Sequence, residues 1–269
     1  AFVIGLSAGA TVLVGQAWGA KNVEKVRCVV GSTLFMTLIG GTLIALLGVI
    51  FTKYILQALG TAPDVLHLSV PYVQWMLAGS PLLFIYIIYT SILRGVGDST
   101  TPLIASAMTI GTGLIITPVL ILGKFGFPKL GIIAPAIATI IGFLIALIFL
   151  YFYLNKTNHP LRPDLALIKH IRHQPELSKI ILRLGIPTGI QMMTTSIAGL
   201  VIVGLVNRYG ADATAAYGAV NQVLNYIQFP ALSISIAASI FAAQAIGAGK
   251  SELLNKVTRT ALGMNIAIT

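Results

Sequence analysis

The feature that most restricts this sequence is a series of apolar runs, each long enough to cross a lipid bilayer as a helix. A helical span needs about 20 mainly apolar residues. Such runs cover residues 1–18, 27–52, 65–93, 100–123, 130–154, 180–207 and 214–246, and an eighth opens near residue 257. None alternates as a transmembrane barrel strand would. The runs predict an all-α polytopic membrane protein.

The scarcity of charge supports this fold class and excludes a soluble globule. Only 9% of the 269 residues are charged, against about 25% in an average soluble domain. Thirteen of the 17 Lys and Arg residues fall on one predicted side of the membrane and four on the other. The positive-inside rule makes the richer side cytoplasmic. The net charge of +10 then indicates topology and contact with the lipid bilayer rather than binding of nucleic acid.

A short internal repeat predicts how the helices are organised. At an offset of 228 residues, the segment 16–24 matches 244–252, with identities that include Gln16/Gln244 and Gly19/Gly247. The matched segments end the first and seventh runs, so the repeat unit is six helices, and an even number keeps both copies parallel. We therefore expect two six-helix bundles.

The sequence begins and ends inside apolar runs, so we expect a fragment truncated at both ends. On this division residues 1–154 form the N-lobe, 155–179 a cytoplasmic linker and 180–269 the start of the C-lobe. Two lobes of this kind suit alternating access, whereas a duplicated scaffold without transport is the plain alternative.

The best polar constellation lies in the seventh run. Tyr217, Asn221, Asn225 and Gln228 fall within 80° of one another on a helix. Such a face cannot lie against lipid without leaving polar groups unpaired. It either lines a substrate cavity or forms a hydrogen-bonded seam between helices. Weaker cavity candidates in other runs are Gln191, Thr195 and Thr117.

The residues offer no basis for enzyme chemistry. All seven acidic residues lie between the runs, and there is no phosphate-binding loop or nucleophile motif. His170 and His173 lack a carboxylate or Cys beside them, so we read them as solvated and predict no metal site. We expect no cofactor.

The segment Leu93–Pro102 carries a resemblance to a known family. Its residues Arg94, Gly95, Gly97, Asp98 and Pro102 are similar to the Arg-Gly-x-Gly-Asp-x-x-x-Pro loop between helices four and five of the multidrug and toxic compound extrusion (MATE) family. The ends at Gln16 and Gln244 resemble that family's paired signature after helices two and eight. The glycines permit a tight turn, and Asp98 or Ser99 can cap the next helix. The charges of Arg94 and Asp98 offer a second reading as a latch.

The resemblance implies a V-shaped transporter, with the visible runs as helices two to eight and part of nine. It implies a secondary antiporter that exports organic cations or drugs in exchange for H⁺ or Na⁺. We expect a monomer in a bacterial inner membrane. A lipid-linked saccharide flippase of the same superfamily is the alternative, although no Lys or Arg lies well within a run to hold phosphates.

Two departures from the family leave the coupling ion open. Many members carry Asn-x-x-x-Asp-Pro in helix five, where this sequence has Gly113 to Thr117 before Pro118. Many carry a Glu eight residues after the helix-seven proline, and counting from Pro187 gives Thr195. The family's coupling carboxylates cannot be transferred to these positions.

Overall fold

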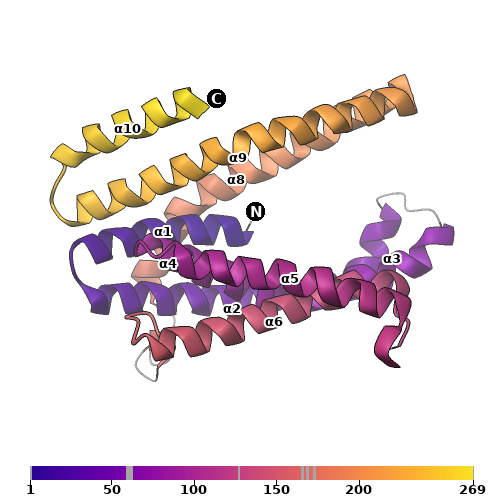
Figure 1. The fold of residues 1–269 in the computed structure, drawn as a ribbon, viewed down its shortest axis with the longest axis horizontal. Helices are drawn as coiled ribbons and strands as arrows, with labels where there is room; N and C mark the ends of the chain where they lie inside the picture. Colours follow the sequence, from indigo (N-terminus) through magenta and orange to yellow (C-terminus); the bar gives the residue numbers. More distant parts are fainter. Residues whose placement is uncertain are drawn as a thin grey trace. The chain divides into compact units, whose positions relative to one another are not determined.

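The structure is a computed structural model that describes residues 2–58, 63–126, 128–164, 167, 170, 171 and 174–268. Within these ranges the chain is helical and contains no strand (Figure 1). The long helices are α1 (Phe2–Gly19), α2 (Val23–Ala58), α3 (Pro63–Ala78), α4 (Ser80–Gly95), α5 (Thr100–Leu122), α6 (Ala134–Lys156), α8 (Pro175–Val206), α9 (Ala211–Gly247) and α10 (Glu252–Ile268). Short 3₁₀ turns are η1 (Lys124–Gly126), η2 (Gly131–Ile133) and η3 (Asn207–Tyr209).

The prediction of an all-α polytopic membrane protein is confirmed. Six helices in the described part of the chain are long and apolar enough to cross a membrane, or seven if α3 and α4 form one bent span. Each predicted run of residues 1–246 coincides with a helix or, for 65–93, with this bent pair. The boundaries differ by a few residues. In particular, α8 begins at Pro175, so the last part of the predicted linker is helical.

The third predicted span is bent by 44° between α3 and α4. The bend lies at Gly79, and Pro81 follows in the first turn of α4, where its missing N–H is tolerated. Pro71 lies inside α3 without ending it. Pro230 likewise lies inside a continuous α9. Prolines are tolerated in membrane helices because local adjustments satisfy the freed carbonyl groups.

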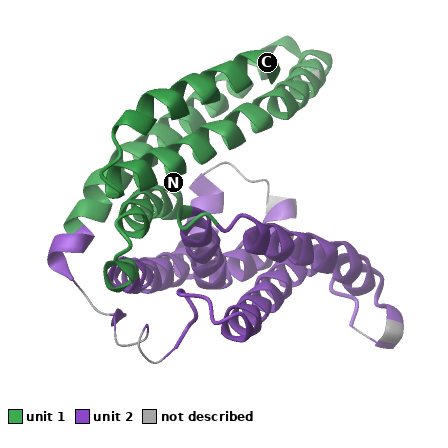
Figure 2. Ribbon diagram, turned by 60° about the vertical axis from the view of Figure 1, so that its left-hand side comes forward, with its two compact units in different colours: residues 1–26, 95–97, 179–269 green, residues 27–94, 98–178 purple. Residues whose placement is uncertain are grey.

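The described chain divides into two compact units (Figure 2). Unit 1 comprises residues 1–26, 95–97 and 179–269, and unit 2 comprises residues 27–94 and 98–178. Unit 1 therefore places α1 with α8, α9 and α10. The predicted lobe boundaries at residues 154 and 179 were drawn from the repeat and stay a prediction.

Unit 2 packs α5 against α6 and α3 against α6. Its core includes Ile88 and Leu93 of α4 and Leu150 of α6, all buried almost completely. The segment after α6 joins this core, since the Tyr89 hydroxyl donates to the Leu161 carbonyl at 2.7 Å. Ser32 of α2 and Ser178 of α8 pair through their buried hydroxyls at 3.2 Å.

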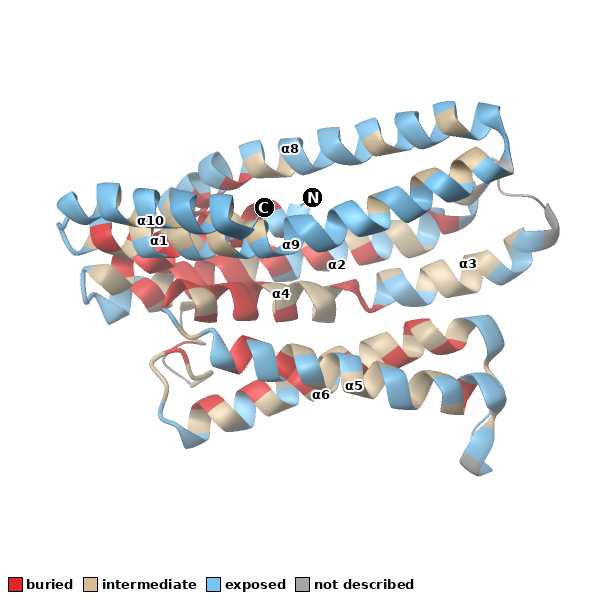
Figure 3. Ribbon diagram, turned by 45° about the horizontal axis from the view of Figure 1, so that its top comes forward, coloured by how far each residue is buried: buried red, intermediate tan, exposed pale blue. Residues whose placement is uncertain are grey.

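In unit 1, α9 packs against both α1 and α10. α1 buries Leu6, Ala10, Val14 and Ala17. In contrast, α8, α9 and α10 expose most of their apolar side chains (Figure 3). Exposed apolar helices of this length fit a lipid environment, because lipid accepts apolar surface that water does not.

Candidate functional site

The four residues predicted to form a polar face all lie on α9, which is one continuous helix. Tyr217 and Asn221 are half-buried, whereas Asn225 and Gln228 are exposed. The Asn221 Nδ2 group donates to the Tyr217 carbonyl oxygen at 3.0 Å, one turn earlier in the same helix. Asn221 thus satisfies one donor locally, and the face keeps amide groups for a ligand or a neighbouring helix.

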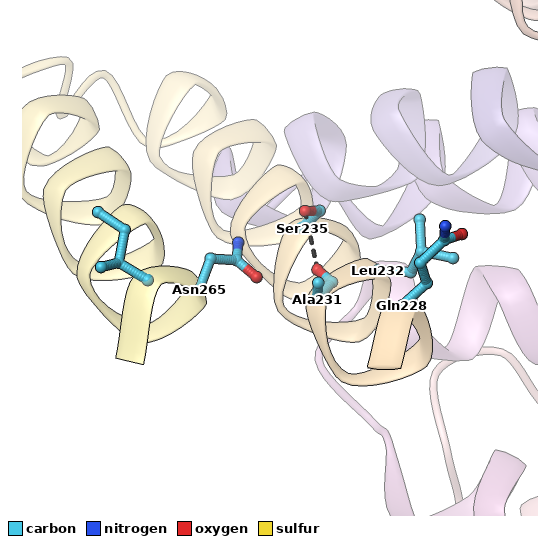
Figure 4. A pocket seen from close by; sticks show the side chains of 6 residues that line it. Gln228, Ala231, Leu232, Ser235 and Asn265 are labelled. Atoms are coloured by element: carbon cyan, nitrogen blue, oxygen red, sulfur yellow. Dashed lines mark hydrogen bonds between the residues drawn. The ribbon is translucent and has the colours of Figure 1, made fainter. Parts of the chain in front are cut away.

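A pocket of about 400 Å³ lies where this polar face meets α10 (Figure 4). Gln228, Ala231, Leu232 and Ser235 of α9 line it, together with Asn265 and Ile266 of α10. Of the four predicted polar residues, only Gln228 is among these six. The remaining three lie further toward the start of α9. The pocket wall is apolar with three separate polar groups, which is the usual chemistry of a small-molecule site.

Ser235 and Asn265 are the polar residues of this pocket that sequence reasoning missed, and Asn265 lies on the other helix. Its side chain points from α10 toward α9 (Figure 4), and its buried Oδ1 atom has no hydrogen-bond partner among the residues that the structure describes. A buried acceptor without a partner is unfavourable. Ser235 cannot supply the missing donor, because its hydroxyl donates to the Ala231 carbonyl oxygen at 2.9 Å. Asn265 therefore lines the pocket while its Oδ1 atom lacks a donor among the described residues.

The weaker candidates do not join this pocket. Gln191 and Thr195 lie on exposed positions of α8, and the Thr195 hydroxyl donates to the Gln191 carbonyl oxygen at 2.9 Å. This is the usual bond of a Thr to its own helix. Thr117 is half-buried in α5, which belongs to unit 2. Their roles as cavity residues stay predictions.

The motif loop after α4 has the contacts of a turn and a helix cap. Gly97 adopts a φ of 94°, which is favourable only for glycine. The Asp98 Oδ1 atom accepts a hydrogen bond from the Thr101 amide at 3.0 Å, and Pro102 is buried in the first turn of α5. Ser99, the other predicted cap, makes no capping bond.

The alternative reading of the loop as a latch finds no support in its contacts. Arg94 donates to the Ser91 hydroxyl at 3.0 Å. The ion pairs in the described part of the chain are both made by Asp164. The contacts of Arg94 and Asp98 therefore favour the reading as turn chemistry.

The two copies of the repeat pack directly against each other. Gly19 of α1 lies so close to the Gln244 carbonyl that a Cβ atom would overlap its oxygen, and Gly247 of α9 stands in the same relation to the Gln16 carbonyl. The contact is thus reciprocal. The glycine of each copy of the repeat lies against the glutamine carbonyl of the other copy. The sequence identified these four residues but not that they touch.

Gln244 also ties the motif loop to this helix pair. Its Nε2 group donates to the Gly95 carbonyl oxygen at 2.9 Å. The two motifs that carry the family resemblance, far apart in the sequence, therefore meet at one hydrogen bond. Side chains that hydrogen-bond across membrane helices fix their packing.

Small residues four apart explain why α1 can approach two helices. Gly5 and Gly9 of α1 lie against the α8 backbone at Gly185 and Ile181. Gly15 and Gly19 belong to the α9 contact, where a Cβ atom on Gly15 would come within 3.0 Å of the Ala243 Cβ. The spacing Gly-x-x-x-Gly is the signal for such packing in membrane helices. It occurs twice in residues 1–19 and could have predicted both contacts.

A polar cluster between the start of α2 and the segment after α6 was also missed. Asp164 pairs with Arg27 at 3.2 Å and with Arg162 at 3.4 Å. The Leu167 amide donates to it at 2.8 Å, and this bond, with the two guanidinium groups, lowers the pKa of the Asp164 carboxyl. Burial lowers the pKa of His159 nearby. His170 lies against Gly31 through its backbone, and His173 lies outside the described residues.

The helices and polar groups together define an integral multi-pass membrane protein whose spans carry hydrogen-bonding faces. A comparison with family models identifies the family to which the chain belongs. The MatE family model matches residues 1–119 and 187–269, and the chain belongs to this family. The resemblance to the MATE family drawn from the two motifs is thereby confirmed.

Among curated relatives, the chain is 44% identical over 267 residues to the probable multidrug resistance protein YoeA of Bacillus subtilis, covering 99% of this chain and 58% of YoeA. It is 31% identical to the probable multidrug resistance protein NorM of Thermotoga maritima, covering 96% of the chain and 54% of NorM. A protein of Shewanella oneidensis named FAD transporter is 28% identical over 93% of the chain and 54% of its own length. The chain thus spans about half the length of these relatives.

Solved structures share the fold. A MOP superfamily transporter from Pyrococcus furiosus superposes with a TM-score of 0.87 at 22% identity, covering 99% of this chain and 58% of its own. An outward-facing multidrug resistance MATE family transporter gives a TM-score of 0.86, also at 22% identity, with the same coverage. This likeness supports the all-α multi-pass membrane fold.

Proposed function

We propose that this chain belongs to a secondary active exporter that moves small organic molecules across a bacterial plasma membrane by alternating access, in exchange for H⁺ or Na⁺. The observation that carries the proposal is the polar face of α9, which lies on a helix long and apolar enough to span a membrane. A polar face at that depth needs partners other than lipid. Substrate and cavity water supply them in a transporter.

The pocket between α9 and α10 is the proposed contact for substrate in this part of the protein. Gln228 and Asn265 offer neutral amide groups, and none of the six lining residues is charged. Such a site recognises hydrogen-bonding groups and apolar surface, so it accepts organic cations as well as neutral molecules.

Coupling in this proposal comes from competition between conformations. An external cation that binds the substrate-free conformation more tightly than the substrate-bound one drives release outward, by its differential affinity for the two. The proposed pocket contains no carboxylate. We therefore propose that the cation binds elsewhere in the transporter, and that H⁺ and Na⁺ are to be told apart by experiment.

The test is gradient-driven movement of a fluorescent organic cation in everted vesicles that carry the full-length protein. We expect accumulation when an H⁺ or Na⁺ gradient is imposed, and the effective gradient names the ion. The variants Gln228→Ala and Asn265→Ala should raise the apparent KM. The matched control, Gln222→Ala, removes the same side chain from α9 outside the pocket and should leave transport unchanged.

Cargo of other chemistry is distinguished in the same vesicles. One of the relatives is named FAD transporter. FAD, a bulky anionic dinucleotide, is therefore the second substrate to test. Movement of FAD without movement of the cation would replace the proposed substrate class. If neither moves with either gradient, in protein shown to be folded, the exporter proposal fails and a lipid-linked saccharide becomes the substrate to test.

A further inference from the structure

A second cavity lies at the cytoplasmic end that the charge distribution predicts for unit 1. It has a volume of about 570 Å³ and is lined by the end of α1, the end of α9 and the start of α10. Figure 1 shows these three helix ends on the same side of the view. The cavity is separate from the pocket at Gln228, with which it shares no residue. Its lining residues are Trp18, Gly19, Lys21, Val23, Phe241, Gln244, Ala245, Ala248, Lys250, Leu253 and Val257.

The two charged residues of this cavity are both cations. Lys21 lies in the turn after α1, in the left-handed conformation with a φ of 56°, and Lys250 follows Gly249, which has a φ of 70°. Each turn is closed by a backbone hydrogen bond, from the Lys21 amide to Trp18 and from the Lys250 amide to Ala245. Both side chains are exposed, and neither belongs to an ion pair among the described residues.

The acidic residues near these turns do not neutralise the cavity. Glu24 and Glu252 lie in the first turns of α2 and α10, where their negative charges interact favourably with the positive end of the helix dipole. Both are exposed and neither lines the cavity. The mouth of the cavity therefore presents two lysines to an anion.

The rest of the wall is apolar and suits a hydrocarbon chain. Phe241 of α9 and Leu253 of α10 are exposed apolar side chains on it, and Val257 lies one turn beyond Leu253. Trp18 sits beside Lys21, and aromatic and basic residues together are typical of the depth of the lipid headgroups. Basic pockets between membrane helices on the cytoplasmic side bind anionic lipid headgroups.

We propose that this cavity binds one anionic phospholipid. Its phosphate lies between Lys21 and Lys250, and an acyl chain lies along Phe241, Leu253 and Val257. We propose a lipid rather than a soluble phosphate, because the apolar wall next to the two lysines can contact an acyl chain, which a soluble phosphate lacks.

The position of the cavity gives the lipid a structural effect. Gly19 and Gln244, which form half of the reciprocal repeat contact, are also part of the cavity wall. A phosphate that bridges Lys21 after α1 and Lys250 after α9 holds together the ends of these two helices. Binding to this arrangement stabilises it by mass action. Anionic lipid should therefore stabilise the α1–α9 contact.

The experiment compares lipid retention by the full-length protein. Purified protein is titrated with phosphatidylglycerol or phosphatidylcholine of matched chains, and bound lipid is counted by native mass spectrometry. We expect preference for phosphatidylglycerol in the wild type. In Lys21→Gln/Lys250→Gln we expect binding weakened about 30-fold, from the typical contribution of two lysines near a lipid surface.

A matched control and a soluble competitor make the outcomes distinct. Lys25→Gln/Lys156→Gln removes the same charge from the same predicted side of the membrane outside the cavity and should keep the preference. Phe241→Ala/Leu253→Ser should weaken lipid binding while the variant still unfolds cooperatively. Equal binding of the two lipids, equal loss in both lysine variants, or displacement of the lipid by glycerol 3-phosphate at equal concentration would overturn the proposal.

Discussion

Substitution of Gly247 by Ala tests whether the reciprocal contact between α1 and α9 holds these helices together. A Cβ atom at this position would overlap the Gln16 carbonyl, which is backbone and cannot rotate away. The helices must therefore separate locally or shift along each other. The equivalent change on α1, Gly19→Ala, creates the same overlap with the Gln244 carbonyl.

The expected magnitude follows from two opposing effects. Ala favours the helical backbone over Gly by about 1 kcal/mol. Overpacking of a close contact costs about 1–3 kcal/mol. Because the obstacle is backbone, the cost lies toward the upper end, and Gly247→Ala should lower the free energy of unfolding by up to about 2 kcal/mol.

A double-mutant cycle sharpens the test. Once one Ala has separated the helices, the Cβ atom of the second Ala meets less overlap. Gly19→Ala/Gly247→Ala should therefore cost less than the sum of the single changes by at least about 0.5 kcal/mol, the coupling seen between residues in contact. The control is Gly218→Ala on the same helix, where no atom lies within 4 Å of the new Cβ. That change should leave stability unaltered or raise it.

Intrinsic fluorescence provides the assay. The chain has two tryptophans, and Trp18 adjoins Gly19, so a Trp75→Phe background leaves a reporter beside the contact. Unfolding in detergent is followed by denaturant titration for the wild type, both single variants, the double variant and the control. Additive costs, or a Gly247→Ala variant as stable as Gly218→Ala, would refute the reciprocal contact as a source of stability.

Three further predictions concern the segments between the spans and one hydrogen bond made to such a segment from α4. Asp98→Ala should lower stability by about 1 kcal/mol through loss of the α5 cap, whereas Ser99→Ala should not, as denaturant titration will reveal. Because folding lowers the pKa of Asp164, the ionised carboxylate stabilises the fold above about pH 4, and this stabilisation is lost as pH falls through the lowered pKa. Asp164→Asn should therefore flatten the acid limb of a curve of stability against pH. Tyr89→Phe leaves the Leu161 carbonyl without its donor and should cost about 1–3 kcal/mol, measured by thermal unfolding with a Tyr209→Phe control at an exposed position.

Much of the fold could be predicted from the sequence because membrane spans are a local property. A run of about 20 apolar residues must satisfy its backbone groups internally, and that requirement makes it a helix. The turn at Gly97 and the cap at Asp98 were predictable for a similar reason, since each depends on residues a few positions apart. Pro71 lies inside α3 without ending it, whereas the chain bends by 44° between α3 and α4, because the effect of a proline depends on what neighbouring groups supply.

The candidate site was only partly predictable. Periodicity placed Gln228 on the polar face of α9, but Asn265 became a site residue only because α10 packs on α9. In the same way, Asp164 joined Arg27 across 137 residues of sequence. No local pattern encodes such pairs, since they depend on where the chain returns.

The sequence by itself determined the fold class, the order and length of the spans, the family motifs and the identity of the repeated residues. Each of these follows from hydropathy or spacing along one stretch of chain. Only the tertiary structure decided that the repeated residues meet each other, that Gln244 joins them to the loop at Gly95, and that two lysines share one cavity. The physical reason is that close contact between helices depends on both backbones at once, and small residues permit that approach without specifying the partner.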